Sequence, residues 1–176
     1  MEYPMNFYYK KSRAVMLFGL LAFLTVVVAV MVLVERFHIY SLLILALLVL
    51  LYYSFWKHIR RGIMIFRNVP CLTLYSDRLL ADPELLGDER RVLIRFDEIE
   101  DIDCDYDDYC TMNVRCSDPR PFYASNRNAL EFISQIKGFE ELVFIMPLSG
   151  VAGGWKYAFY SIRDTFYDYY DKAHQT

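Results

Sequence analysis

Two long apolar runs dominate the pattern of hydrophobic and polar positions along the chain. They cover residues 14–34 and 39–56, contain no charged residue, and are separated only by residues 35–38. At about 1.5 Å per helical residue, the first run reaches about 31 Å, which matches the hydrocarbon core of a bilayer. Because backbone polar groups in lipid must be bonded internally, both runs are expected to be transmembrane helices that form a hairpin around an outer turn.

Basic residues gather where the predicted hairpin begins and ends. They are Lys10, Lys11 and Arg13 before the first run and Lys57, Arg60 and Arg61 after the second. The outer turn has one basic residue, Arg36. Because basic flanking segments remain inside, we predict a multi-pass protein of the cytoplasmic (inner) membrane with both termini cytoplasmic. Residues 1–13 then form a cytoplasmic or interfacial segment, and residues 57–69 form a basic collar and linker.

Two other interpretations of the apolar runs remain. A cleaved signal peptide also starts with basic residues, but its apolar region is only about 7–15 residues long, and here a second run follows at once. Two buried core helices of a soluble protein would need a larger chain to cover them, because both runs are apolar on every side.

Small residues share one face of the first run, at Gly19, Ala22, Thr25 and Ala29. Such a face lets another helix approach closely. We expect the second run of the same chain to occupy it, with a homo-oligomer contact as the alternative.

After the collar, residues 70–176 are expected to form one small cytoplasmic α+β domain. Alternating apolar residues predict strands. These strands cover residues 71–75, 79–80, 91–96, 111–116, 122–124 and 142–146. Asn126 begins a helical pattern that ends at Lys137 and Gly138, and the Gly-rich residues 149–154 predict a flexible loop. The last segment, residues 155–172, predicts an amphipathic helix that packs on the sheet.

Several hydrophobic positions of this domain form a recurring set. They are Pro70-x-Leu72-x-Leu74, Leu79-Leu80 before Asp82, Ile94-x-Phe96-Asp97-Glu98-Ile99, Met112-x-Val114 and the closing Tyr-rich helix. This set resembles a largely uncharacterised family of small bacterial inner-membrane proteins with two transmembrane helices followed by a pleckstrin-homology (PH)-like domain. The resemblance implies a PH-like antiparallel β-sheet or barrel with a C-terminal amphipathic helix, and it implies no reaction. Phe96 stands where the family often has Trp, and a Gly common after the start of the second strand is missing.

Charge divides the chain at the predicted membrane exit. Residues 1–61 carry a net charge of +5 and residues 62–176 a net charge of −8, which together give the formal net charge of −3. An acidic domain repels nucleic acid and anionic lipid headgroups. We therefore predict no nucleic-acid partner, and we expect only the basic collar to be attracted to the inner leaflet of the lipid bilayer.

The acidic residues are concentrated in residues 97–108, where eight of twelve positions are Asp or Glu. The alternating aspartates copy the start of a calcium loop, but the sixth position lacks its Gly and the twelfth its bidentate Glu, so no metal site is predicted. The stretch is expected to be a solvated strand end and loop in which Ile99 and Ile102 point inward. The alternative is a contact with a basic protein partner, made by Asp103, Asp105, Asp107 and Asp108.

The other chemistry-bearing residues predict no active site. Cys71, Cys104, Cys110 and Cys116 lack the spacing of zinc ligands, and we expect four free thiols in a reducing cytoplasm. No histidine lies near a plausible nucleophile or paired acid, and the Gly-rich loop lacks the Lys-Ser/Thr of a phosphate loop. We therefore expect no catalytic residue, no cofactor and no enzyme activity.

These observations favour a membrane-anchored, non-enzymatic protein-interaction module. Two alternatives remain open. One is a lipid- or small-ligand-sensing membrane module, for which the collar and the many aromatic residues are suited. The other is an immunity-type protein that acts against a membrane-directed toxin.

Overall fold

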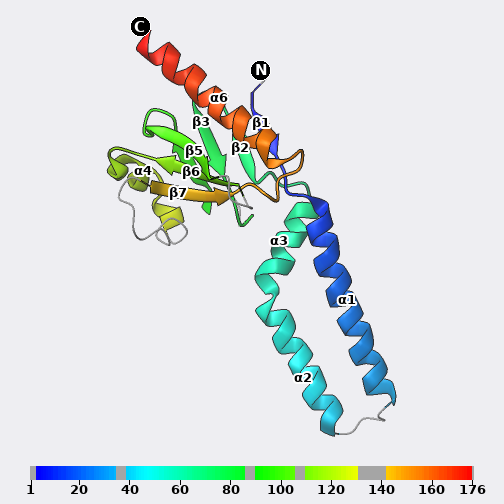
Figure 1. The fold of residues 1–176 in the computed structure, drawn as a ribbon. Coiled ribbons are helices and arrows are strands. Elements are labelled where there is room, and N and C mark those ends of the chain that lie inside the picture. Colours follow the sequence, from blue (N-terminus) through cyan, green and yellow to red (C-terminus); the bar gives the residue numbers. More distant parts are fainter. Residues whose placement is uncertain (1–2, 35–38, 86–89, 106–109, 131–141, 176) are drawn as a thin grey trace. The chain divides into compact units, whose positions relative to one another are not determined.

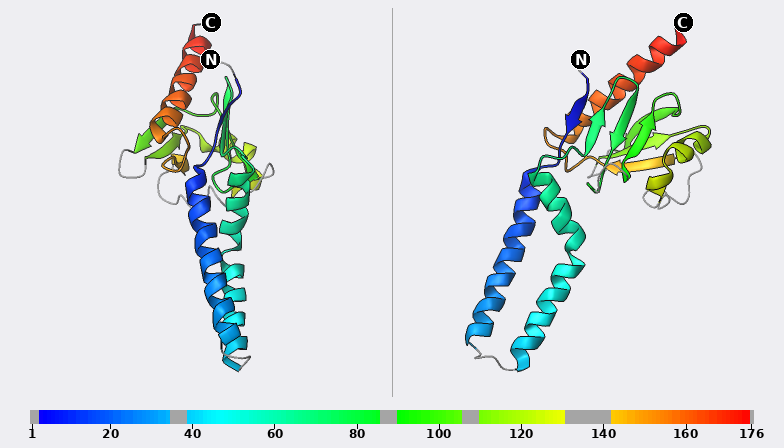
Figure 2. Two further views of the ribbon diagram at one scale, coloured as in Figure 1. Left: turned by 90° about the vertical axis from the view of Figure 1, so that its right-hand side faces the viewer. Right: turned by 180° about the vertical axis from the view of Figure 1, so that it is seen from behind.

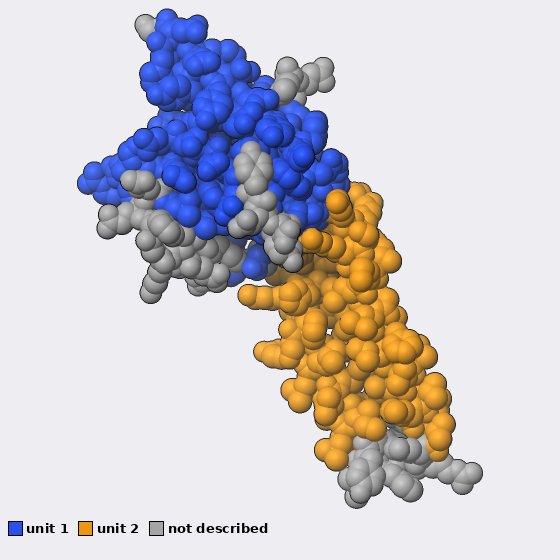
Figure 3. Space-filling view, in the orientation of Figure 1, with its two compact units in different colours: residues 1–9, 69–176 blue, residues 10–68 orange. Residues whose placement is uncertain are grey.

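The computed structural model describes residues 3–34, 39–85, 90–105, 110–130 and 142–175. The chain divides into two compact units (Figure 3). Lys10–Asn68 form a helical unit, whereas Met1–Tyr9 and Val69–Thr176 together form a sheet domain. The sheet domain is therefore discontinuous in sequence, with the helical unit inserted between its first two strands.

The helical unit contains α1 (Lys11–Val34), α2 (Ile39–Ser54) and α3 (Trp56–Phe66), and α1 lies beside both of the others (Figures 1 and 2). Within α1, Lys11–Met31 is long and apolar enough to cross a membrane. The helices that follow are bent by 58° at their junction and would make a second span only if the bent pair acted as one. One membrane-crossing helix is thus supported by length and composition, and the second predicted span is not confirmed.

The predicted linker at residues 57–69 is wrong for most of its length, because α3 continues to Phe66. Ile59, Gly62 and Ile65 are buried at a three-residue spacing, while Lys57 and Arg60 are exposed. An amphipathic helix results, since one stripe of α3 can pack while the other stays polar. The basic residues obscured this periodicity in the sequence.

The expected contact of the small-residue face is also wrong. Gly19, Ala22 and Ala29 are exposed, and a Cβ added to Gly19 would meet no atom within 4 Å. Only Thr25 of this set faces α2, where its Oγ1 lies 2.7 Å from the Tyr52 hydroxyl. Close packing occurs on α3 instead, because a Cβ added to Gly62 would lie 2.7 Å from the Phe18 ring.

The sheet domain contains two antiparallel sheets, and no closed barrel forms among the described residues. The first sheet has the order β1 (Met5–Phe7), β2 (Leu72–Leu74), β3 (Arg78–Ala81) and β4 (Val92–Arg95). The second has the order β5 (Asp101–Asp105), β6 (Thr111–Arg115) and β7 (Leu142–Pro147). The expected strands in residues 71–75, 79–80, 91–96, 111–116 and 142–146 are confirmed.

The N-terminal segment, predicted only as a cytoplasmic or interfacial stretch, contributes β1 to the first sheet. Met5 pairs with Leu74 and Phe7 with Leu72. Phe7 and Tyr9 are buried, and the Tyr9 hydroxyl donates to the Pro83 carbonyl oxygen at 2.9 Å. β1 therefore depends on pairing with β2, which is far away in sequence.

The core of the domain lies between the sheets and α6 (Trp155–His174), which confirms the predicted terminal helix (Figure 1). Phe166 meets Phe96 edge-on with ring centroids 5.6 Å apart, and Tyr157 approaches Phe7 of β1 at 6.1 Å. The inward residues of the strands are fully buried. They include Leu72, Leu74, Leu79, Val92, Ile94, Met112 and Val114.

The short strand predicted at residues 122–124 is wrong, because this segment is part of α4 (Pro119–Ser125). Asp118 caps the helix by accepting from the Arg120 amide, and Pro119 stands at its first position, where proline suits a helix. A single turn, Arg127–Ala129, follows. The rest of the predicted helix, including Lys137 and Gly138, lies outside the described residues.

Candidate functional site on the acidic strand

Strand β5 carries three of the acidic side chains of residues 97–108 in alternating positions. Ile102 and Cys104 are buried on its inner side, while Asp103 and Asp105 are exposed and Asp101 is half-buried on its outer side. Sequence analysis predicted a solvated strand end and loop in which Ile99 and Ile102 point inward; both isoleucines are buried, but residues 101–105 form a strand of their own. Aspartate is unfavourable in strands, and its abundance concealed the apolar alternation.

The Asp101 and Asp103 carboxylates each contact a side chain from another element. Asp101 Oδ1 accepts from the Tyr167 hydroxyl of α6 at 3.2 Å, and Asp103 Oδ2 lies 3.8 Å from Arg115 Nη2 of β6. Burial, with a smaller contribution from Asp101, raises the pKa of Tyr167. The tyrosine therefore stays protonated and continues to donate at neutral pH.

Two of these carboxylates also bind the strand's own backbone. The Ile102 amide donates to Asp101 Oδ1 at 2.9 Å, and the Cys104 amide donates to Asp103 Oδ1 at 2.6 Å. β5 is the last strand of its sheet on one side. Since these amides are already bonded, β5 offers a partner its carboxylates rather than free N–H groups, which is a common way to protect an edge strand.

The β4 edge of the first sheet is also protected by a side chain that bonds to its backbone. Asn126 lies against β4, where its Oδ1 accepts from the Leu93 amide at 2.6 Å and its Nδ2 donates to the Leu93 carbonyl at 2.7 Å. The same Nδ2 donates to the Phe122 carbonyl oxygen, and the residue is buried. Sequence analysis assigned Asn126 to a helix start and missed this bridge.

The carboxylates of β5 follow one another along the strand instead of converging on one point. Among the described residues, no group of three or more His, Cys, Asp or Glu is placed to hold a metal ion. Asp107 and Asp108, the other two predicted contact residues, lie outside the described part of the chain. The geometry therefore suits a charged contact surface.

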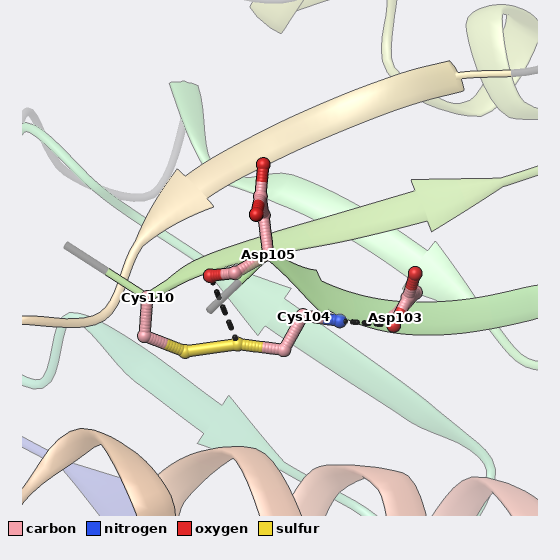
Figure 4. The surroundings of a disulfide bond; sticks show 4 residues. All are labelled: Asp103, Cys104, Asp105 and Cys110. Atoms are coloured by element: carbon pink, nitrogen blue, oxygen red, sulfur yellow. Dashed lines mark hydrogen bonds between the residues drawn. A yellow bond between two sulfur atoms is a disulfide. The ribbon is translucent and has the colours of Figure 1, made fainter. Parts of the chain in front are cut away.

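The expectation of four free thiols is wrong for two of the cysteines. Cys104 of β5 and Cys110, which directly precedes β6, form a disulfide with Cα atoms 6.1 Å apart (Figure 4). The pairing of β5 with β6 brings the two residues together, and this contact was hidden because β5 was not recognised as a strand. Cys71 and Cys116 are not part of a disulfide, and both are fully buried.

Cys116 sits in surroundings that hold it as a thiol. Burial, followed by the nearby Glu98, Glu100 and Asp118, raises its pKa to about 12. A thiolate at this position is therefore rare at neutral pH, and the thiol is a poor nucleophile.

The predicted basic collar lies entirely in the helical unit. Lys10, Lys11 and Arg13 are exposed where α1 begins, and Lys57 and Arg60 are exposed on α3, while Arg61 is half-buried. Because α3 packs against the first half of α1 at Phe18, the two basic groups share one end of the unit (Figure 2).

A cavity of about 560 Å³ lies beside β4 and was not indicated by any sequence motif. Leu80 and Leu93 form one wall, and residues 124–129 form another. Arg91 also lines it and lies 4.0 Å from the buried Asp82 carboxylate. Its walls come from three separate segments, so only the folded chain brings them together.

Comparison of the chain with known protein families, curated proteins and solved structures finds no match.

Proposed function

We propose that this chain is a membrane-anchored, non-enzymatic protein-interaction module whose β5 carboxylates recruit a protein with a basic face. The observation that carries the proposal is the outward alignment of Asp101, Asp103 and Asp105 on one side of β5. Aligned carboxylates create a negative potential that attracts a basic surface and favours its correct orientation.

The state of the β5 backbone favours recognition through side chains. A partner that adds a strand to a sheet needs free amides on the edge, and those of Ile102 and Cys104 are already donated to neighbouring carboxylates. Lysine and arginine side chains of a partner need only the carboxylate oxygens. The contact is accordingly salt-sensitive.

The proposal also includes the arrangement in the membrane. Residues 14–34 and 39–56 form a two-span hairpin in the inner membrane, with the basic collar of α3 at its cytoplasmic end and both termini and the sheet domain in the cytoplasm. The basic residues at the shared end of α1 and α3 support this orientation. Two antiparallel sheets followed by α6 are consistent with the PH-like architecture that the sequence resemblance implies.

The test is cross-linking capture from the source membrane by the full-length protein held in lipid nanodiscs. The variant D103N/D105N removes two exposed carboxylates from β5, and the control D168N/D171N removes two from α6. We expect wild type and control to capture the same basic protein, with at least a tenfold loss for D103N/D105N and for wild type at high salt. Equal capture by both variants, or no specific capture by wild type, would contradict the proposal.

A lipid-sensing role is favoured by a different observation, the two faces of α3. Lys57 and Arg60 are exposed beside Trp56, while the opposite stripe is buried against α1. This combination suits a helix at the headgroup level of an anionic leaflet. Adding phosphatidylserine to the nanodiscs should then raise the Tm of wild type more than that of K57Q/R60Q, whereas a control variant, R127Q/K156Q, should respond like wild type.

A further inference from the structure

The disulfide between Cys104 and Cys110 closes the hairpin of β5 and β6 near its tip. Asp105 pairs with Thr111 and Cys104 with Met112, so Cys110, just before Thr111, lies diagonally across from Cys104 at the end of the described strand pairing (Figure 4). Their Cα atoms are 6.1 Å apart, and both side chains are buried. Strand pairing therefore positions the sulfur atoms, whether or not the bond is present.

The hairpin has enough other contacts to persist without this bond. The hairpin side chains Ile102, Met112 and Val114 are buried in the core of the domain. The Cys110 carbonyl accepts from the Leu148 amide at 2.9 Å, which fixes the backbone at Cys110 from a third segment. The bond also closes a loop with a sequence separation of only six, and short loops give a disulfide the least entropic effect on stability.

The reduced form has a hydrogen-bond acceptor already in place. Cys104 Sγ lies 3.8 Å from the Asp105 carbonyl oxygen (Figure 4). A disulfide sulfur carries no proton, so this contact can be a hydrogen bond only when Cys104 is a thiol. Both redox forms are therefore compatible with the same backbone.

The two remaining cysteines do not compete for this bond. The Cys71 thiol is fully buried and donates to the Phe7 carbonyl oxygen at 3.3 Å. Cys116 is also fully buried and is held as a thiol by its raised pKa. Neither residue takes part in the disulfide, and the raised pKa of Cys116 makes its thiolate rare at neutral pH.

We propose that Cys104 and Cys110 are a reversible redox modification site, a dithiol–disulfide couple that responds to the thiol redox state around the sheet domain. In a reducing cytoplasm, such pairs are redox-responsive rather than permanent. The co-reactant is a disulfide, either a low-molecular-weight one or that of an oxidoreductase. This inference does not depend on the identity of any protein partner.

The exchange proceeds in two balanced steps. One cysteine thiolate attacks a sulfur of the reagent disulfide, which forms a mixed disulfide and releases one reagent thiolate. The second cysteine then attacks the mixed disulfide at the protein sulfur and releases the second reagent thiolate. The protein loses two electrons and two protons, and the reagent disulfide becomes two thiols that take up those protons.

The test is equilibration of the full-length protein in detergent with glutathione buffers, using a glutaredoxin as catalyst and starting from both redox forms. Free thiols are then alkylated after acid quenching and assigned by peptide mass spectrometry. We expect Cys104 and Cys110 to convert together, from mostly alkylated to mostly protected, over a roughly hundredfold change in the ratio of squared glutathione to glutathione disulfide. Cys71 and Cys116 should stay alkylated throughout after denaturation and serve as internal controls.

Single substitutions provide the matched controls. In C104S and in C110S the remaining cysteine should form no bond within the chain, and any protection from alkylation in oxidising buffers should carry the mass of one bound glutathione. A pair that stays oxidised in the most reducing buffer is a permanent structural bond, and this result would overturn the proposal. Persistent reduction in the most oxidising buffer, or a bond to Cys71, to Cys116 or to a second chain, would overturn it equally.

Discussion

The helical unit and the sheet domain expose opposite kinds of side chain. Phe23 is 65% exposed and Leu33 75% exposed on α1, whereas Leu72 and Leu79 in the sheet are fully buried. Apolar exposure along a whole helix is what a lipid surrounding accommodates, and water penalises it. The sheet domain instead places its apolar groups in one interior, as a domain in water must.

The two units also differ in how they are held together. The sheet domain relies on many buried side chains and on polar groups whose partners are in place, such as Asn126 at the edge of β4. The helical unit relies on a few contacts, including the Thr25–Tyr52 hydrogen bond and the close approach of Gly62 to Phe18. Substitutions should therefore be costly throughout the interior of the sheet domain and costly at only a few points of the helical unit.

The largest contrast should come from two phenylalanines. Phe96 is buried against Phe166 and Tyr169, whereas Phe23 lies exposed on α1. F96A should destabilise the sheet domain by about 3–5 kcal/mol, because a large ring leaves a cavity. F23A should leave its stability within about 0.5 kcal/mol. Amide hydrogen exchange of β3 and β4 in the full-length protein measures both, and equal protection in the two variants would contradict the comparison.

The next largest effect should follow loss of the Asn126 bridge. N126A leaves the Leu93 amide and carbonyl without their partner in a partly buried site, which should cost about 2–3 kcal/mol. The exposed Asn128 offers the matched control, and N128A should change stability by less than about 0.5 kcal/mol. Urea unfolding of the full-length protein gives both values. If N126A changed the free energy of unfolding by no more than N128A, β4 would not need this edge protection.

A smaller effect should appear at alkaline pH through Cys116. Its folded pKa of about 12 lies above its ordinary value of 9.0, so the unfolded chain loses this proton first. Stability should be unaffected below about pH 9 and should fall between about pH 9 and pH 12, by about 1.4 kcal/mol per pH unit. Urea unfolding of wild type and C116A at about pH 8 and pH 10 measures how much Cys116 contributes to this loss of stability. Parallel losses in the two proteins would show that Cys116 does not contribute.

The smallest effect should distinguish two glycines of the helical unit. G62A places a methyl group against the Phe18 ring and should destabilise the unit by about 1 kcal/mol, because overpacking outweighs the helix propensity of alanine. G19A adds a methyl group in open space and should be neutral or stabilising by up to about 1 kcal/mol. Thermal unfolding in detergent, followed by helical circular dichroism, compares them. Similar destabilisation by both would indicate that the Gly19 face is also packed.

Much of the sheet domain could be predicted because local pattern and final structure agree there. β2, β3, β4, β6 and β7 each place alternate apolar residues inward, and α6 repeats apolar residues at helical spacing. β1 could not be predicted, because three residues carry little pattern and their partner Leu72 follows the helical unit. The fragment 70–176, which sequence analysis identifies as the domain, therefore lacks the buried Phe7 and Tyr9.

Other departures arise where a local preference conflicts with a contact. Phe122 and Tyr123 have side chains that favour strands, yet the cap at Asp118 starts a helix there. At the candidate site, the sequence located Asp103 and Asp105 but not their neighbours. Arg115 and Tyr167 reach the site only through the pairing of β5 with β6 and the packing of α6, which no local pattern encodes.

The insertion of the helical unit between β1 and β2 has a mechanical consequence. Phe7 and Leu72 are ladder partners, and the chain leaves β1 and enters β2 at this same end. Any lateral pull that separates Lys10 from Asn68 is therefore borne first by the hydrogen bonds of Tyr8 and Tyr9 to the sheet domain, next by the Phe7–Leu72 pair, and then by each pair behind it. A ladder loaded in this way opens like a zipper, one pair at a time, and resists far less force than strands sheared along their length. Spreading of the helix ends would thus be felt in the sheet domain as peeling of β1.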